Sequence, residues 1–373
     1  MNDSPDNIPL ILISSGGTGG HMTPAAALAH DLAARGNKLA LITDERGKKF
    51  AGMFPENIPV HIIRAGTVGG GPAGKFRGLV NLGAGLVQAW RIVSDLEPDL
   101  VVGFGGYPSF PGVFVAQKQR VPAIIHEQNA VIGKANCYLS KKAERIALSF
   151  PDLTGLEKDE RMRAVITGNP IRPEIAALHK TPYPRPQPDG PLNILIMGGS
   201  LGASVFSKVV PQTLAQLPSE YKKRLNVVQQ CREEDLEPTA FAYKDSGIKA
   251  EVASFYNDMA ERLAAAHLVI CRSGASTVAE VTAAGRPAIF VPYPHHKDQQ
   301  QKRNADHVAD GGGAWMMTED GFTPEALLAR LTAFLQNPAI LGEAAEKCRA
   351  FGKPDAAHKL GNLVKSVVSG PGY

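Results

Sequence analysis

The chain of 373 residues has few cysteines, few aromatic side chains and little excess charge. Its four cysteines form no CxxC pair, so neither a disulfide framework nor a zinc site is indicated, and we expect a reducing compartment. No apolar run approaches the ~18 residues of a membrane span, and the polar start MNDSPDN is unlike an export signal. A net charge of only +4, without interleaved basic and aromatic residues, argues against nucleic acid as a partner. Anionic small molecules and an anionic membrane surface stay open as partners.

What the sequence does have is a repeated alternation of strands and helices. Apolar, β-branched runs are separated by helical patterns at 8–13, 38–43, 58–63, 99–104, 122–126 and 145–150. A second series begins with NILIM and continues at 225–230, 248–253, 268–271 and 287–291. This alternation predicts doubly wound parallel sheets. The prolines of HKTPYPRPQPDGPL, residues 179–192, indicate a linker between the two series.

Two glycine-rich turns have the same design. ILISSGGTGG (11–20) and NILIMGGSLGA (193–203) both lead from an apolar strand through Gly-Gly-Thr/Ser-x-Gly into a helix. The chain therefore has two related α/β halves, and we expect the ligand site in the crevice between two facing domains. The cluster of glycines at 16–20 indicates close approach of a ligand. Thr23 as cap, Pro24 at the first helical position and Gly36 past the end predict the helix that follows.

Three familiar glycine-containing motifs match this sequence only in part. The dinucleotide fingerprint that starts at Gly17 lacks its third glycine, and a Walker-like run at 69–75 is followed by Phe76 instead of Ser or Thr. A formal GxSxG around Ser200 has the strand-turn-helix context of a hydrolase nucleophile, and histidines follow it at 267, 295, 296 and 307. Because Thr18 takes the serine position in the matching first turn, we favour a phosphate-binding hydroxyl. The α/β serine hydrolase is kept as an alternative.

Three polar clusters follow predicted strands. In CRSGASTVAE (271–280), a helix from Ala275 offers its positive end to a diphosphate, and Glu280 is either a ribose ligand or an ordinary exposed carboxylate. The amides of HEQN (126–129) and HHKDQQQKRNA (295–305) both donate and accept, which suits sugar hydroxyls. A solvated helix face explains the second cluster nearly as well. We expect no metal at 295, 296 and 298, because adjacent histidines rarely converge on one ion.

These motifs occur in one order over nearly the whole chain: GGTGGH, GGYPSFPG, HEQNAVIGKAN, GNPIR, GGSLGA and CRSGASTVAEVTAAGRPAIFVPYPHHKDQQQKRNA. Together they resemble the MurG family of glycosyltransferases. The resemblance implies transfer of N-acetylglucosamine (GlcNAc) from UDP-GlcNAc to lipid I, undecaprenyl-pyrophosphoryl-MurNAc-pentapeptide, giving lipid II for peptidoglycan. It implies a peripheral protein on the cytoplasmic face of the bacterial inner membrane. A non-catalytic nucleotide-sugar-binding subunit is the other alternative.

The resemblance also implies a GT-B fold, an α/β architecture of two Rossmann-like, doubly wound parallel-sheet domains that face a central cleft. Residues 1–171 are expected to form the acceptor-side and membrane-side domain. Residues 172–353 are expected to form the UDP-GlcNAc-binding domain, and a helix at about 354–373 is expected to pack back on the first domain.

Carried over position by position, the resemblance assigns the substrate-binding residues. It puts the nucleotide sugar against Thr18, Gly19, Gly20, Asn129, Arg172 and Ser200 and against the helix start of Ser273, Gly274, Ala275, Ser276 and Thr277. It gives the ribose to Glu280, the GlcNAc hydroxyls to Gln300 and Gln301, and the uracil to the region of Phe255, Tyr256 and Met259, with Tyr256 acting through its backbone. Two residues depart from the family pattern, Leu201 and Phe110.

The implied reaction is a single displacement that inverts the anomeric carbon, and it needs a base for the acceptor hydroxyl. His21 is the candidate general base, because histidine titrates near neutrality and this one stands beside the first glycine turn. A histidine that only caps the loop or the helix start is the competing interpretation. No D-x-D pair occurs in the chain, so we expect neither a metal-clamped diphosphate nor any other cofactor.

The segment 74–93 is the candidate membrane contact. Leu79, Leu82, Leu86, Trp90 and Val93 fall on one helical face, beside Lys75, Arg77 and Arg91. An apolar stripe with a basic rim suits an anionic lipid surface. Packing of the same stripe on the protein's own sheet is the alternative.

Overall fold

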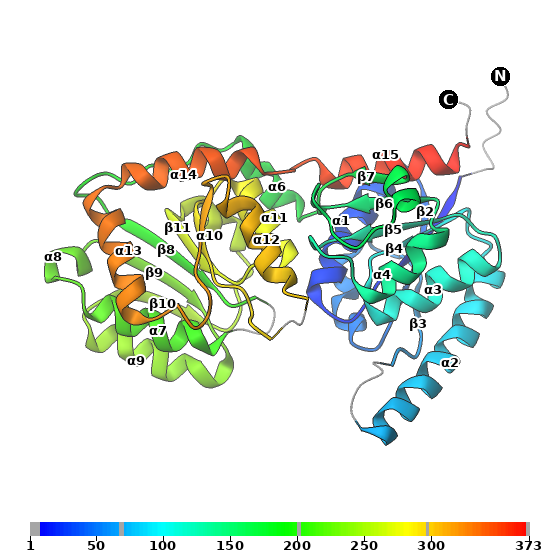
Figure 1. Ribbon diagram of the computed structural model, residues 1–373, viewed down its shortest axis with the longest axis horizontal. Coiled ribbons are helices and arrows are strands. Elements are labelled where there is room, and N and C mark those ends of the chain that lie inside the picture. The colour runs from blue at the N-terminus through cyan, green and yellow to red at the C-terminus, as the bar shows by residue number, and fades with distance from the viewer. Residues whose placement is uncertain (1–7, 67–70, 200–202, 296–297, 371–373) are drawn as a thin grey trace. The chain divides into compact units, whose positions relative to one another are not determined.

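The computed structural model describes residues 8–66, 71–199, 203–295 and 298–370, except for the side chains of residues 72–75. The chain divides into two compact α/β units, whose elements are labelled in Figure 1. The first unit holds the chain up to Arg172 together with the segment from Asp355 onward, and the second runs from Pro173 to Pro354. No helix within the described ranges is both long enough and apolar enough to cross a bilayer.

The first unit is built on one parallel sheet of seven strands in the order β3-β2-β1-β4-β5-β6-β7. Its strands are β1 (Leu10–Ser14), β2 (Lys38–Thr43), β3 (Val60–Ile62), β4 (Leu100–Gly103), β5 (Ala123–Glu127), β6 (Arg145–Leu148) and β7 (Ala164–Ile166). Its α-helices are α1 (Gly19–Ala34), α2 (Pro72–Leu96), α3 (Gly106–Lys118), α4 (Lys134–Leu139), α5 (Lys158–Met162) and α15 (Ala356–Val368). The strand order reverses between the neighbours β1 and β4, which is where open α/β sheets bind ligands.

Alternation of side chains along β1 gives this sheet two buried faces. Ile11 and Ile13 point to the face that α1 and α15 cover, and Leu12 points to the face that α2 and α3 cover. All three side chains are fully buried. Burial on both faces is why these strands are continuous apolar runs in the sequence.

Helix α15 completes the core of the first unit. Leu360, Leu363 and Val364 pack in the cluster that contains the buried face of α1. Arg35 at the end of α1 donates to the carbonyl oxygen of His358 at 2.9 Å. The last described helix is therefore part of the unit that also contains the N-terminal part of the chain.

Helix α1 begins earlier than its sequence predicts. Thr23 and Pro24 were expected as cap and first residue, but the helix starts at Gly19 with Thr18 as the N-cap residue, so this prediction is wrong. Met22, which lies in the first turn of the observed helix, is fully buried in the core. The end is as predicted, because Gly36 follows the helix in the left-handed conformation with φ of 82°.

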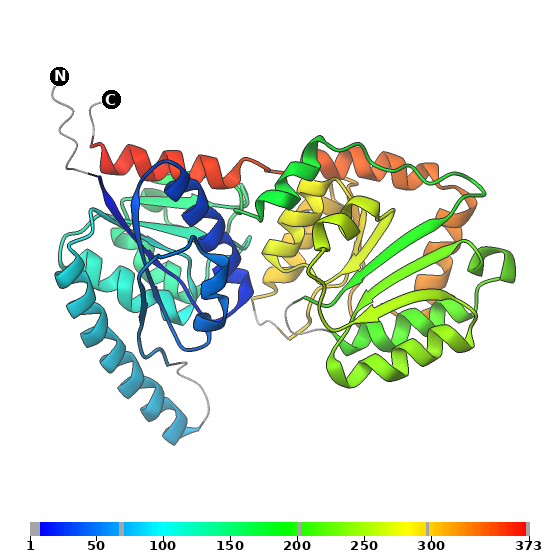
Figure 2. The ribbon, with the colours of Figure 1, turned by 180° about the vertical axis from the view of Figure 1, so that it is seen from behind.

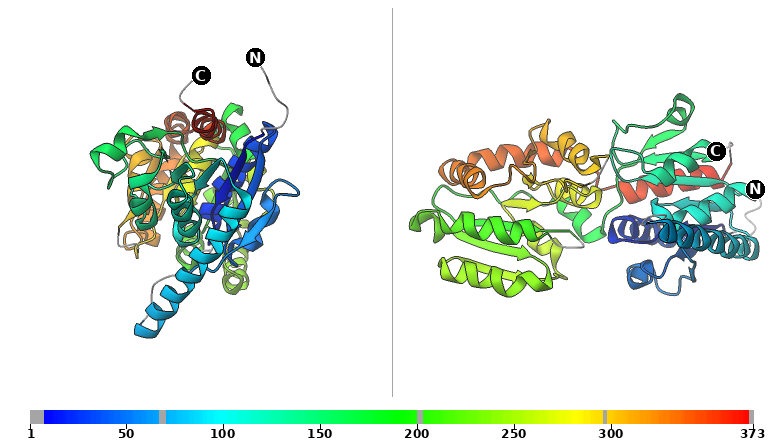
Figure 3. Two further views of the ribbon diagram at one scale, coloured as in Figure 1. Left: turned by 90° about the vertical axis from the view of Figure 1, so that its right-hand side faces the viewer. Right: turned by 60° about the horizontal axis from the view of Figure 1, so that its bottom comes forward.

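Helix α2 projects beyond the rest of the first unit (Figure 3). The predicted apolar stripe on this helix divides into two parts. Leu86 and Val93 pack toward the sheet, whereas Leu79 and Trp90 are 63% and 50% exposed. Phe76 near the projecting end is 71% exposed. Part of the stripe therefore belongs to the core and part faces solvent.

The second unit repeats the plan of the first with a parallel sheet in the order β10-β9-β8-β11-β12-β13. Its strands are β8 (Leu192–Met197), β9 (Leu225–Gln230), β10 (Lys249–Ala253), β11 (Leu268–Cys271), β12 (Ala288–Phe290) and β13 (Ala314–Met316). Its α-helices are α6 (Pro173–Ala177), α7 (Ser204–Ala215), α8 (Ser219–Lys222), α9 (Leu236–Asp245), α10 (Met259–Ala265), α11 (Ala275–Ala284), α12 (Gln300–Ala309), α13 (Pro324–Gln336) and α14 (Ala339–Ala350). In Figure 2 the green strands β8, β9 and β10 lie side by side in this sheet.

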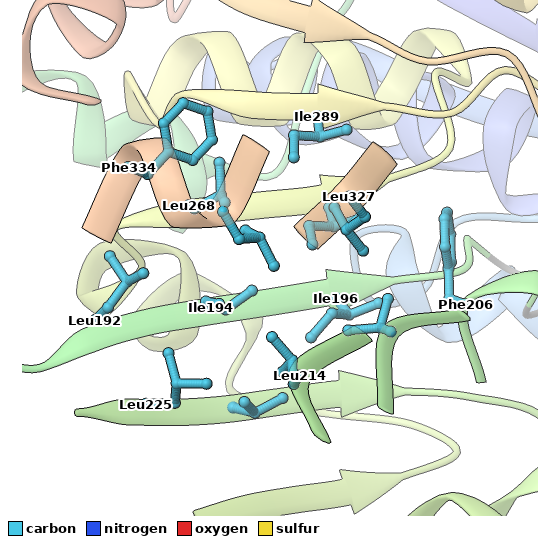
Figure 4. Packing of buried hydrophobic residues seen from close by; sticks show 14 of the residues in the cluster. Leu192, Ile194, Ile196, Phe206, Leu214, Leu225, Leu268, Ile289, Leu327 and Phe334 are labelled. Atoms are coloured by element: carbon cyan, nitrogen blue, oxygen red, sulfur yellow. The ribbon is translucent and has the colours of Figure 1, made fainter. Parts of the chain in front are cut away.

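The core of the second unit fills the space between its sheet and the helices α7 and α13. Ile194 and Ile196 of β8 meet Leu214 of α7 and Leu327 of α13 there (Figure 4). All four side chains are buried. Apolar contacts of this kind fix the strands whose carboxyl ends carry the polar loops described below.

The proline-rich segment 179–192 packs along the second unit. It contains no long helix or strand, as its prolines predict, but it is not a free linker. Arg349 donates to the carbonyl oxygens of His179 and Thr181, and the Tyr183 hydroxyl donates to the carbonyl oxygen of His267 at 2.7 Å. The break between the units falls before this segment, after Arg172.

Candidate active site

Two helices of the first unit begin side by side at the reversal of strand order. Helix α1 follows β1 and helix α3 follows β4, and within the described residues neither helix start is capped by a side chain. Gly105 and Gly106 enter α3 with φ of 76° and 73°, which glycine adopts without strain. Backbone amides and the positive ends of both helices are thus directed to one place, as in an anion-binding site.

The first glycine turn gets its shape mainly from Gly17. This residue has φ of 85°, and its N–H group donates to Oδ1 of Asp44 at 2.9 Å. Gly19 and Gly20 already belong to the first turn of α1, and the Thr18 side chain is exposed. The predicted contacts Thr18, Gly19 and Gly20 therefore lie together at one helix N-terminus.

His21 lies in the first turn of α1 and is partly exposed. Its Nδ1 lies 3.1 Å from Oε1 of Gln128, which directly follows β5. Its ring lies beside Gly106, where an added Cβ would come within 3.2 Å of Cδ2 and Nε2. The loops that follow β1, β4 and β5 thus meet at the His21 ring.

The predicted residue Asn129 is held by its neighbour Glu127, which sequence reasoning missed. The Glu127 side chain is only 2% exposed, and Oε1 accepts the backbone N–H of Asn129 at 3.1 Å. Oε2 accepts the N–H of Gly133 at 3.0 Å and Nδ2 of Asn136 at 2.8 Å. The acidic residue inside the polar motif HEQN was the available signal for this role.

The second unit places helix α11 at its own reversal of strand order. This helix follows β11, the neighbour of β8, and starts at Ala275 after Gly274, as predicted. Ser276, Thr277 and Glu280 are partly exposed on it. The turn after β8 has Gly199 with φ of 76°, the same conformation as Gly17 in the first unit. Ser200 and Leu201 lie outside the described residues.

Ser273 is a structural residue of the α11 start. It is fully buried, and its hydroxyl donates to the carbonyl oxygen of Gln301 at 2.8 Å. Its own carbonyl oxygen accepts Nδ2 of Asn304 at 3.1 Å. The Ser273 side chain thus ties the α11 start to the first turn of α12 and joins two predicted donor-binding segments.

Gln300 and Gln301 begin helix α12 and are both partly exposed. Oε1 of Gln301 accepts the backbone N–H of Tyr293 at 3.0 Å, which fixes the orientation of this side-chain amide. Arg272, which sequence reasoning also missed, donates to the carbonyl oxygens of Val291 and Pro292 at 3.1 and 3.2 Å. These bonds fix the start of the loop that leads to both glutamines.

The predicted uracil region consists mostly of buried side chains. Tyr256 is 6% exposed, its hydroxyl donates to the carbonyl oxygen of Glu251 at 3.1 Å, and the Arg262 guanidinium lies 3.9 Å from its ring centre. Burial raises the pKa of Tyr256 to about 12. Met259 is 8% exposed, whereas Phe255 is 69% exposed. Of these three, only Phe255 offers its side chain to a ligand.

Three other predictions concern Arg172, a metal at 295, 296 and 298, and Phe110. Arg172, the last residue of the first unit's main segment, is partly exposed. His296 lies outside the described residues, and in the described part of the chain no group of three His, Cys, Asp or Glu side chains could hold a metal ion. Phe110 stacks on Phe114 at 5.4 Å and lies 5.5 Å from the Tyr138 ring, which explains a large residue at this position.

The hydrolase alternative gains no support from His267. Nδ1 of this histidine accepts the backbone N–H of Asn193 at 3.0 Å, near the start of β8. The glycine turn with Gly199 follows the opposite end of the same strand. His267 therefore lies at the amino end of β8, away from the described part of that turn.

The two Rossmann-like sheets share one strand order over six strands, each with a helix N-terminus at its reversal point, and together with the family models that follow they identify a glycosyltransferase of the GT-B fold. Models of the glycosyltransferase family 28 N-terminal domain and C-terminal domain match residues 11–148 and 193–360. The chain therefore belongs to the MurG family within glycosyltransferase family 28.

The similarity extends over nearly the full length of the following relatives. The chain is 52% identical to the UDP-N-acetylglucosamine--N-acetylmuramyl-(pentapeptide) pyrophosphoryl-undecaprenol N-acetylglucosamine transferase of Rhodospirillum centenum, over 95% of this chain and 93% of that protein. The protein of the same name from Rhodospirillum rubrum is 45% identical over 97% and 93%. The crystal structure of Acinetobacter baumannii MurG matches with a TM-score of 0.77 at 33% identity, over 96% of this chain and 99% of that chain.

Proposed function

We propose that this protein transfers GlcNAc from UDP-GlcNAc to the 4-hydroxyl of the N-acetylmuramyl group of lipid I and so forms lipid II for peptidoglycan synthesis. The observation that carries the proposal is 52% identity over 95% of the chain to a relative that is named for this transfer. The polar loops at both reversal points agree with it, because they supply a helix start for a diphosphate and a histidine for a hydroxyl proton.

The second unit is proposed to bind most of the donor. The amides at the start of α11, with Ser276 and Thr277, would face the diphosphate, and Glu280 one and a half turns further would accept from the ribose hydroxyls. Gln300 and Gln301 would read the GlcNAc hydroxyls. The partial exposure of these side chains supports the assignment. Arg172, Ser200, Thr18, Gly19, Gly20 and Asn129 are proposed as further donor contacts, and Tyr256 as a backbone contact to the uracil.

His21 is proposed as the general base of the reaction. The acceptor oxygen forms a bond to the anomeric carbon while the bond from that carbon to the UDP oxygen breaks. UDP leaves with the bonding electron pair, and the hydroxyl proton passes to Nε2 of His21. The positive end of α11 lowers the energy of the charge that develops on the leaving diphosphate. No cofactor takes part in this scheme.

The test is a transfer assay with labelled GlcNAc and a lipid I analogue. The wild-type protein should form the disaccharide product, and His21→Ala should reduce kcat by ~10²–10⁴, the usual contribution of a general base. UDP-GlcNAc affinity should stay nearly unchanged. His30→Ala is the matched control, because His30 is also on α1 but is exposed, with Nε2 at 3.0 Å from the carbonyl oxygen of Met53. Absence of transfer by the wild-type protein would overturn the proposed function. An unchanged kcat in His21→Ala would refute the role of His21 as general base.

Helix α2 is proposed to rest on the cytoplasmic surface of the bacterial inner membrane. Phe76, Leu79, Val87 and Trp90 are each half or more exposed on it. The exposed Arg77 lies between the first two in sequence, and such basic residues favour anionic lipid headgroups. Because α2 projects from its unit, these side chains can reach a surface without any change in the core (Figure 3).

Vesicle sedimentation tests the membrane contact. Leu79→Glu should weaken binding to vesicles that contain anionic lipid, because a carboxylate disfavours both the apolar interior and the negative surface. Met162→Glu is the control, since Met162 is 81% exposed but lies on α5 of the same unit. Equal binding of both variants and the wild-type protein would show that α2 does not carry the contact.

A further inference from the structure

A chain of hydrogen bonds leads from the His21 ring into the interior of the first unit. Nδ1 of His21 lies 3.1 Å from Oε1 of Gln128, and Nε2 of Gln128 lies 2.9 Å from Nδ1 of His126. Nε2 of His126 lies 3.0 Å from the carbonyl oxygen of Gly168. These four groups come from α1, from β5 and the residue after it, and from the loop after β7.

Two members of this chain are enclosed by the protein. His126 is fully buried, with its ring 5.3 Å from that of Phe104, and Gln128 is 2% exposed. Burial is the main reason why the pKa of His126 is lowered to about 4, with the charge of His21 acting in the same direction. Glu127, the adjacent carboxylate, directs its oxygens to other N–H groups. His126 is therefore a neutral ring at neutral pH.

The Gly168 carbonyl oxygen fixes the tautomer of His126. A carbonyl oxygen can only accept, so Nε2 of His126 must carry the hydrogen. A neutral imidazole has one N–H group, and Nδ1 of His126 is therefore an acceptor. It accepts from the amide nitrogen of Gln128.

The amide of Gln128 has only one satisfactory orientation. Its nitrogen faces two acceptors, Nδ1 of His126 at 2.9 Å and the carbonyl oxygen of His126 at 3.1 Å. If the amide were flipped, its oxygen would face both of these acceptors with no hydrogen between them. Oε1 of Gln128 must therefore face His21, and the hydrogen of that contact must belong to Nδ1 of His21.

The other nitrogen of His21 is left with its lone pair. Among the described residues Nε2 of His21 has no hydrogen-bond partner, although the ring is partly exposed. Gly106 lies against this edge of the ring, and any side chain there would press on Nε2. The acceptor nitrogen is thus both defined by the hydrogen-bond chain and accessible.

We propose that Gln128 and His126 are positioning residues that hold His21 in the Nδ1–H tautomer, so that its Nε2 can accept the proton of the acceptor hydroxyl. The proposal deepens the function proposed above and rests on it for the identity of that hydroxyl. The hydrogen-bond direction is set at the Gly168 carbonyl oxygen and passed outward through two neutral groups. No charged partner is needed to select the tautomer.

The first experiment reads the tautomers directly in the full-length wild-type protein. In protein labelled with ¹⁵N-histidine, long-range ¹H–¹⁵N correlation spectra at neutral pH distinguish the two ring nitrogens. We expect the hydrogen on Nδ1 of His21 and on Nε2 of His126, with signals assigned through His21→Gln and His126→Gln. A hydrogen on Nε2 of His21 would overturn the inference. This readout needs no substrate, so it stands apart from the proposed function.

The second experiment measures the kinetic effect. Gln128→Met keeps the length of the side chain and removes the acceptor, so kcat of the transfer assay should fall about tenfold or more, up to the ~10²–10⁴ that a general base contributes. KM for UDP-GlcNAc should stay within about twofold, because Gln128 is buried and would not contact the donor. His30→Gln, which changes an exposed histidine on the same helix, should leave kcat unchanged.

The outcomes separate the two proposals. If the wild-type protein does not transfer GlcNAc, the function fails while the tautomer spectra still decide the hydrogen-bond chain. If it transfers and Gln128→Met keeps the wild-type kcat, the positioning role is wrong. If Gln128→Met does not fold, the wild-type spectra alone decide.

Discussion

Replacing Glu127 by glutamine keeps the shape of the side chain and converts one of its two acceptor oxygens into a donor. Each oxygen accepts from two N–H groups in the wild-type protein, three of them in the loop that follows β5 and one on Asn136 of α4. Whichever way the new amide turns, its NH₂ group must face two donors. Glu127→Gln should therefore break two hydrogen bonds to a charged group inside the protein.

The lengths of the wild-type hydrogen bonds predict which carboxylate oxygen of Glu127 is replaced by the NH₂ group. Oε1 of Glu127 accepts from Asn129 at 3.1 and 3.4 Å, whereas Oε2 accepts from Gly133 and Asn136 at 3.0 and 2.8 Å. The amide nitrogen should turn toward Asn129. At ~1.5–3 kcal/mol for each hydrogen bond to a charged group, local opening at Asn129 should become easier by about 3 kcal/mol or more. This corresponds to roughly 100-fold faster amide exchange.

Residue-resolved hydrogen exchange is the assay. The N–H of Asn129 should exchange roughly 100-fold faster in Glu127→Gln, and the N–H of Gly133 should keep more of its protection. Glu144→Gln is the matched control, because Glu144 is an exposed carboxylate of the same unit that pairs with Arg145 at 3.4 Å. Unchanged exchange at Asn129 would refute the claim that this carboxylate orders the loop, and a larger effect at Gly133 would refute the assigned orientation.

Two further predictions concern the donor and the pH. Glu280→Ala should weaken UDP-GlcNAc binding by ~1–3 kcal/mol in calorimetry, the scale for hydrogen bonds to a charged group, while Glu261→Ala on α10 should not; equal affinities would exclude the ribose contact. Because the pKa of His126 is about 4 in the folded chain and 6.5 in the unfolded chain, only the unfolded chain takes up this proton as the pH falls from 6.5 to 4. Stability should then fall by about 3 kcal/mol over that window in urea unfolding, and His126→Gln should lose this part of the slope; parallel slopes would contradict the argument.

The strands show what the sequence pattern could and could not reveal. The expected ranges 38–43, 225–230 and 268–271 coincide with β2, β9 and β11. Both missed strands, β7 and β13, have three residues and lie at sheet edges. In β7, Val165 and Ile166 are 39% and 50% exposed, so this strand lacks the continuous buried run that marks a central parallel strand. Pairing with a neighbour defines β7 and β13, and a local pattern does not contain that pairing, whereas the equally short edge strand β3 lies inside the predicted apolar run 58–63.

The candidate site shows the same division between local and long-range information. Short sequence motifs were enough to predict the first glycine turn, His21 beside it and the start of α11. The structure contains a helix after each of these turns, with His21 in the first turn of α1. The contact between His21 and Gln128 joins residues that are 107 positions apart, and the parallel order of β1, β4 and β5 creates it. The preference of Pro24 for a first helical position did not reveal that α1 starts at Gly19, five residues earlier, with Met22 buried in its first turn.

Because α15 packs in the first unit, the core of that unit can be completed only after α15 has been translated. Chains fold as they emerge from the ribosome, and amino-terminal domains ordinarily finish first. Here the apolar strip of α1 that Leu360, Leu363 and Val364 cover must stay open to water until the entire second unit has been translated. The core of the segment that is synthesised first is therefore completed last. Until then this segment exposes apolar surface of the kind that chaperones bind.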